Sequence, residues 1–186
     1  MKQHLLLGAA LLAGLSFLGT AAAEGPKSGP QVGEKIPGAF HPLNINGTGA
    51  GKKHCLVCEH GTSPVAMVFA RDLTPAVTTL IKKLEEATGK NSGANMGSFV
   101  VFCSDDEKLQ KSLKDLVEKE KLKNVALAID NPAGPTEYKV AKDADVTVVL
   151  YNKHEIKVNQ SFKKGELTDK DADKIVSELT KILPAK

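Results

Sequence analysis

The feature that most constrains the fold is a short apolar run followed at once by a helix start, over residues 64–75. Residues 65–70 read Val-Ala-Met-Val-Phe-Ala, without the alternation of a half-buried strand, which is typical of a central strand buried on both faces. Thr74 is suited to cap a helix, and Pro75 is suited to its first turn, where a missing N–H costs nothing. Apolar residues then recur at helical spacing up to Gly89. The sequence therefore predicts a buried strand, a tight turn and a helix.

The residues that follow this strand are unusual for the place they occupy. In an open α/β sheet, sites are usually built at the carboxyl ends of the central strands. Residues 71–76 stand at that end and contain no cysteine and no histidine. We interpret Arg71 and Asp72 there as a satisfied turn pair in preference to an anion-binding pair. The cysteine pair of the chain, Cys55 and Cys58, precedes the strand instead.

The first 23 residues predict a signal peptide. Lys2 and His4 form a polar head, residues 5–18 form an apolar run, and Ala21-Ala22-Ala23 forms a small-residue cleavage site. The apolar run is too short for a comfortable membrane span. We therefore expect export to a periplasm or to the cell exterior and no membrane association after cleavage, with an uncleaved amphipathic anchor as the less favoured alternative.

The rest of the chain predicts one leader and one domain. Residues 24–31 are rich in Gly, Pro and Lys and predict a flexible leader, and residues 32–186 are long enough for one domain with a core of its own. The formal net charge is only +3, and lysines are spread among acidic residues, as they are over residues 82–86. Only 4% of the residues are aromatic. This composition argues against nucleic-acid binding.

Apolar spacing along the domain predicts alternating strands and helices. Further strands are predicted at residues 98–103, 125–129, 146–151 and 155–162. Further helices are predicted to start at residues 104–106 and after Thr168, which Asp171 follows three residues on, with a short helical piece at residues 137–141. This order predicts an α/β fold: a mostly parallel central sheet flanked by helices on both faces, a C-terminal antiparallel β-hairpin and a final helix. Residues 32–45 predict an edge hairpin or an extended arm.

Several of these segments, in this order, resemble the thioredoxin-like superfamily, in its peroxiredoxin-like and exported thiol–disulfide oxidoreductase forms. The similar segments are residues 32–40 (the opening segment), 67–70 (the central strand), 98–106 (the second strand and its acidic turn), and 138–140 before 146–151 (the helix before the hairpin). The resemblance covers residues 33–183 and implies a thioredoxin-like fold.

The positions that carry the chemistry of that family are not filled in the usual way. The resemblance implies a Cys-x-x-Cys directly after the central strand, where this chain has Leu73-Thr74-Pro75-Ala76. The peroxidatic cysteine of peroxiredoxins belongs to the same region and is absent, and Val146 stands in the place of the cis-proline. The resemblance therefore implies a fold that is kept while its usual chemistry is lost or moved.

The densest chemistry lies in the segment His54-Cys55-Leu56-Val57-Cys58-Glu59-His60. Two cysteines three residues apart can meet in a tight turn or in a first helical turn, and an exported chain allows a disulfide. The neighbouring Lys52, Lys53 and histidines favour the reactive thiolate. The pair is not a haem-attachment motif, because Glu59 follows Cys58.

Three interpretations of this pair stay open. The first is a structural disulfide that pins the loop, although so short a loop removes little chain entropy. The second is a reversible redox pair that needs no cofactor. The third is a zinc or copper site that uses His54 and His60 with the two cysteines, although one Cys-x-x-Cys is only half a zinc signature.

Cys103, at the end of the second predicted strand, is interpreted as a small buried core residue. The alternatives are a lone thiol at the strand end or a resolving partner for the Cys55 loop. We therefore expect an exported thioredoxin-fold protein that exchanges disulfides with a protein thiol partner, with Cys55 and Cys58 as its catalytic residues. A non-catalytic binding module with a structural disulfide and a Cys/His metal-binding protein are the alternatives.

Overall fold

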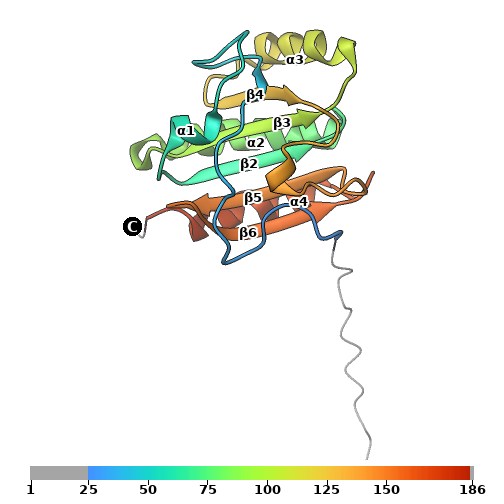
Figure 1. Cartoon of the computed structure of the whole chain (residues 1–186). Coiled ribbons are helices and arrows are strands. Elements are labelled where there is room, and N and C mark those ends of the chain that lie inside the picture. The colour runs from blue at the N-terminus through green and yellow to red at the C-terminus, as the bar shows by residue number, and fades with distance from the viewer. Residues whose placement is uncertain (1–24, 185–186) are drawn as a thin grey trace, which may run out of the picture.

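The computed structural model describes residues 25–184 (Figure 1). The predicted signal peptide lies outside these residues and stays a prediction. Within the described range, no helix combines the length and the apolar character that crossing a membrane requires.

One sheet of six strands organises the chain, in the spatial order β1-β4-β3-β2-β5-β6. The strands are β1 (Leu43–Asn44), β2 (Val65–Ala70), β3 (Gly97–Cys103), β4 (Val125–Asp130), β5 (Val146–Asn152) and β6 (Glu155–Phe162). The predicted strands are confirmed to within a residue at each end, and residues 32–42 form an arm, a turn at 32–34 and then a segment without helix, that leads into the short strand β1.

The prediction of a mostly parallel sheet is wrong. Only the β2–β3 and β3–β4 pairs are parallel, whereas β1–β4, β2–β5 and β5–β6 are antiparallel. The cause is the connection between β4 and β5, residues 131–145, which we call the crossing loop. It passes the carboxyl end of β2, where Arg71 N donates to Asp145 O at 3.0 Å. Strand β5 therefore starts where β2 ends, with Val146 opposite Ala70, and has to run the other way.

Helices lie on both faces of the sheet, as predicted, but unequally, because all three long helices cover one face. Helices α2 (Pro75–Lys90), α3 (Glu107–Glu120) and α4 (Asp169–Ser177) contribute to one apolar cluster, and Figure 1 shows α2 and α4 behind the sheet. Right-handed crossovers that step in one direction, from β2 to β3 to β4, place α2 and α3 on the same side. The other face is left to the short helix α1 (Leu56–His60), the 3₁₀ turn Thr136–Tyr138 and the N-terminal arm.

The predicted helix caps are confirmed. Thr74 Oγ1 accepts a hydrogen bond from Val77 N at 3.2 Å, with Pro75 in the first turn of α2. Thr168 and Asp171 form a complete capping box at the start of α4. These caps fix where each helix begins relative to the strand before it.

The leader predicted to be flexible is packed against the sheet from Ser28 onward. Ser28 is 1% exposed, and its Oγ lies 2.7 Å from Thr147 Oγ1 of β5. Asn159 Nδ2 of β6 donates to the carbonyl oxygens of Ser28 and Pro30 at 2.8 Å each. Because these hydrogen bonds satisfy carbonyl groups of the leader backbone, the leader is held against β5 and β6.

An aromatic cluster holds the arm on the same face. Tyr138 lies between Phe40 of the arm and Phe69 of β2, with ring centroids 4.9 and 5.6 Å away. Burial raises the pKa of Tyr138, so its hydroxyl stays protonated and donates to Gly38 O at 2.6 Å. The arm is therefore joined to the crossing loop both by the ring contact with Phe40 and by the hydrogen bond to Gly38.

Replacing Tyr138 with Phe tests this tie. Tyr138→Phe keeps the ring and removes the donor to Gly38 O, so we expect the free energy of unfolding to fall by about 1 kcal/mol in urea titrations. Tyr151→Phe is the matched control, because the buried Tyr151 hydroxyl has no hydrogen-bond partner among the described residues. Its loss should be neutral or stabilising. Equal destabilisation by both variants would contradict the assigned role of Tyr138.

Candidate functional site

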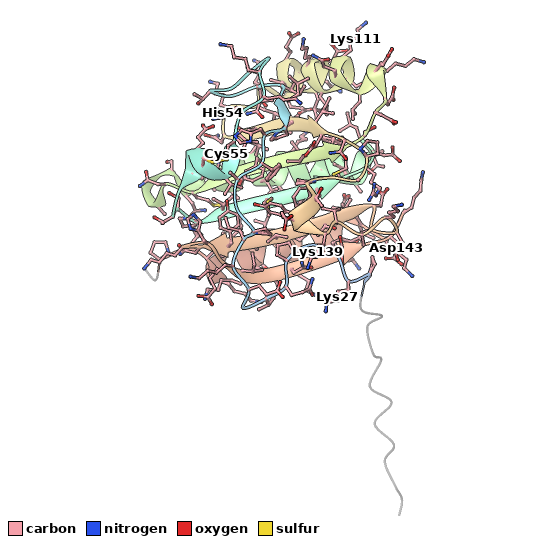
Figure 2. The ribbon with its side chains drawn as sticks, viewed as in Figure 1. Lys27, His54, Cys55, Lys111, Lys139 and Asp143 are labelled. Carbon is pink, nitrogen blue, oxygen red and sulfur yellow. A yellow bond between two sulfur atoms is a disulfide. The ribbon has the colours of Figure 1, made fainter. Side chains whose placement is uncertain are left out.

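Helix α1 lies at the amino-terminal edge of β2, away from the carboxyl end where open α/β sheets usually build sites (Figure 1). Figure 2 shows Cys55 and His54 toward one end of the strands and Asp143, in the crossing loop, toward the other. Leu56 and Val57 hold the helix on the sheet, since they are only 2% and 5% exposed. Cys55 and Cys58, which precede the central strand in the sequence, therefore also lie at its amino-terminal end in space.

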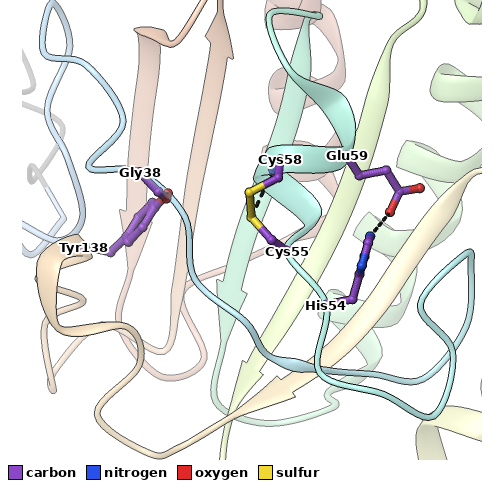
Figure 3. Close-up of a disulfide and its surroundings, with 6 residues drawn as sticks. All are labelled: Gly38, His54, Cys55, Cys58, Glu59 and Tyr138. Carbon is purple, nitrogen blue, oxygen red and sulfur yellow. Dashed lines mark hydrogen bonds and ion pairs between the residues drawn. A yellow bond between two sulfur atoms is a disulfide. The ribbon is translucent and has the colours of Figure 1, made fainter.

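Cys55 and Cys58 form a disulfide across the first turn of α1, with Cα atoms 5.2 Å apart (Figure 3). Cys55 is the N-cap residue, and its Sγ accepts a hydrogen bond from Cys58 N at 3.1 Å. The two residues differ in access, because Cys55 is 5% exposed whereas Cys58 is an exposed residue. Of the two residues of the disulfide, Cys55 is therefore covered and Cys58 is open to solvent.

His54 binds Glu59 and not the sulfur atoms, contrary to the expectation that the neighbouring histidines favour a thiolate. Its Nε2 lies 3.0 Å from Glu59 Oε2, and Thr48 Oγ1 donates to the other carboxylate oxygen at 3.0 Å. Figure 3 shows His54 directed at Glu59 and away from the disulfide. The His54–Glu59–Thr48 contacts tie the glycine-rich loop of residues 46–51 to α1.

His60 anchors the other end of α1. Its ring stacks on Phe99 with centroids 6.0 Å apart and planes 13° apart. It also lies directly over Gly97, where a Cβ atom would stand 2.4 Å from His60 Nδ1, so that position has no room for a side chain. Burial lowers the pKa of His60, an effect that Glu59 partly opposes, and its Nε2 is buried with no hydrogen-bond partner within residues 25–184. The His60 ring therefore packs between α1 and β3.

The zinc or copper alternative has no geometric basis among residues 25–184, where no three His, Cys, Asp or Glu side chains group around a common point. The two sulfurs are bonded to each other, His54 pairs with Glu59, and His60 stacks on Phe99. The four expected ligands are therefore engaged separately.

Solved structures resemble the chain over most of its length, although no family model and no curated protein sequence matches it. The yeast mitochondrial 1-Cys peroxiredoxin has a TM-score of 0.58 at 15% identity, over 81% of this chain and 76% of that chain. Peroxidoxin BcpB of Mycobacterium tuberculosis has a TM-score of 0.58 at 13% identity, over 84% and 98%. A secreted disulfide oxidoreductase of the same organism, homologous to E. coli DsbE, has a TM-score of 0.53 at 14% identity, over 74% and 94%. The fold is thioredoxin-like.

In this thioredoxin-like fold the side chain at the carboxyl end of β2 binds backbone carbonyl groups. The Arg71 guanidinium donates to the carbonyl oxygens of Pro132, Ala141 and Ala144 at 2.8 to 2.9 Å. Asp72 pairs instead with Lys164 at 3.4 Å. The interpretation of Arg71 as a satisfied residue is confirmed, but its partner is the crossing loop and not Asp72.

Cys103 is a core thiol, as expected for the end of a buried thioredoxin-like strand. It is 3% exposed, and a Cβ atom at Gly134 would lie only 3.2 Å from its Sγ. Burial raises the pKa of the Cys103 thiol to about 12, so almost none of it is thiolate near neutral pH. Since Cys55 and Cys58 are bonded to each other, Cys103 is not their partner.

The burial of His60 predicts a pH dependence of stability. A lowered pKa in the folded state means that the unfolded chain binds the proton more readily, so stability is complete above the ordinary histidine pKa and falls as the pH drops below it. Between about pH 7 and about pH 5, the free energy of unfolding measured in urea should fall with the pH in the wild-type protein. His60→Gln should make this fall less steep, by up to the slope that the binding of about one proton contributes.

His41→Gln is the control for this experiment, because it removes an exposed imidazole. The control should keep the wild-type slope. Identical slopes in wild type and His60→Gln would contradict the lowered pKa of His60.

Proposed function

We propose that this protein exchanges disulfides with protein thiol partners through Cys55 and Cys58, a redox pair moved to the amino-terminal edge of the thioredoxin-like sheet. The observation that carries the proposal is the disulfide itself, set on a surface helix with Cys58 exposed. An exchange reaction needs a disulfide that a partner thiolate can reach. A partner dithiol would give up two electrons and two protons to the pair, and no cofactor is needed.

A purely structural role for the disulfide has weaker support. The bridge joins residues only three positions apart, so it removes little entropy from the unfolded chain. Helix α1 is already held on the sheet by the buried Leu56 and Val57 and by His60 against Phe99. At the carboxyl end of β2, which the non-catalytic binding alternative would use, Arg71 is already hydrogen-bonded to three carbonyl oxygens of the crossing loop.

Peroxidase chemistry is the less suitable of the two activities found among the similar structures. A peroxidatic cysteine needs a thiolate, and residues 71–76 at the end of β2 contain no cysteine. The nearby Cys103 is covered and its pKa is raised to about 12. Thiol–disulfide exchange at Cys55 and Cys58 is therefore the activity that the residues support best.

We propose export as part of this function. Residues 1–23 have the pattern of a signal peptide, and residues 32–186 are proposed as the thioredoxin-like domain that the packed leader covers. An oxidising compartment would keep Cys55 and Cys58 as a disulfide between reactions. The partner would be another protein carrying a dithiol or a disulfide.

Redox titration in glutathione buffers tests the proposal. After equilibration, thiol labelling and peptide mass mapping should show Cys55 and Cys58 converting together at a potential above about −300 mV, while Cys103 stays unlabelled. A variant carrying both Cys55→Ser and Cys58→Ser is the control and should show no redox-dependent labelling. A bond that stays oxidised until the protein unfolds would overturn the proposed exchange.

A further inference from the structure

We infer that Cys58, the second cysteine of the pair, is the residue that exchanges with the partner, and that Cys55 is the resolving cysteine. This assignment rests on the proposed function and adds the order of the two sulfurs. It depends on the difference in access between the two residues and on the hydrogen bond that Cys55 Sγ accepts.

Access favours attack at Cys58. In α1 the residues Leu56 and Val57 face the sheet, so the next helical position, Cys58, faces outward. Cys55 lies before the helix in an extended conformation, and it is 5% exposed within the cluster that covers β2. A thiolate from another protein can therefore reach Cys58 and not Cys55.

The hydrogen bond favours Cys55 as the leaving and resolving group. Cys55 Sγ accepts from Cys58 N at 3.1 Å, and a hydrogen bond of this kind strengthens when the acceptor becomes negatively charged. A leaving sulfur whose thiolate is stabilised departs faster in thiol–disulfide exchange. The stabilising N–H group therefore donates to Cys55 Sγ, the sulfur that should leave, and not to Cys58 Sγ, the sulfur that should be attacked.

The reaction steps follow from this order. A thiolate of a partner dithiol attacks Cys58 Sγ, the Cys55–Cys58 bond breaks, and Cys55 leaves as a thiolate that takes up a proton. The second thiolate of the partner then attacks the partner sulfur bonded to Cys58, and Cys58 leaves and takes up the second proton. In the reverse direction, the Cys58 thiolate attacks a partner disulfide and Cys55 displaces the partner from Cys58. The mixed disulfide is on Cys58 in both directions.

Single-cysteine variants test the assignment with oxidised glutathione as the probe. Reduced Cys55→Ser retains Cys58, and reduced Cys58→Ser retains Cys55. With acid quenching and intact mass measurement, Cys55→Ser should form its glutathione adduct roughly tenfold or more faster than Cys58→Ser. Equal rates, or a faster reaction of Cys58→Ser, would overturn the assignment.

Two further measurements keep the test decisive. The double variant retains only Cys103, which is buried and should stay unmodified, so any adduct there reports unfolding. In the unaltered protein, reduced glutathione added to the oxidised pair and quenched with acid should be found on Cys58, and recovery on Cys55 would overturn the assignment. Failure of the proposed function is distinct, because then the native disulfide would resist glutathione whatever the order of the variant rates.

Discussion

The complete burial of β2 determines where the other elements lie. All six of its residues are covered, so both faces of the sheet need a layer. The three long helices fill the face of Ala66, Val68 and Ala70. The face of Val65, Met67 and Phe69 is closed by smaller pieces, which are the arm, the Tyr138 turn and α1. The disulfide sits at the amino-terminal edge because α1 is the piece that covers that end of β2.

Local signals predicted the elements, and long-range contacts decided their arrangement. The apolar runs located the strands, and Thr74, Thr168 and Asp171 located the helix starts, because caps and burial act within a few residues. The direction of β5 depended on where the crossing loop returns to the sheet, which Arg71 fixes through carbonyl groups far along the chain. The packed leader likewise depends on Thr147 and Asn159, more than a hundred residues away.

The candidate site was predictable in its residues but not in its geometry. The spacing of Cys55 and Cys58 allowed a disulfide as well as a metal site, whereas their unequal exposure follows from which face of α1 meets the sheet. The orientation of His54 toward Glu59 was missed, since proximity in sequence does not give side-chain direction. The packing of His60 was also missed, although Gly97 at a strand start is a signal of close approach by another group.

The rate at which dithiothreitol reduces the Cys55–Cys58 disulfide in the folded protein tests most directly whether this pair is a redox site. Because Cys58 is exposed, the rate in native buffer should be within about tenfold of the rate in concentrated urea, or faster. The Cys103 thiol, labelled in parallel, reports unfolding and should stay protected in native buffer. Reduction that proceeds only as fast as Cys103 becomes labelled would contradict a redox role and leave the disulfide as a structural bond.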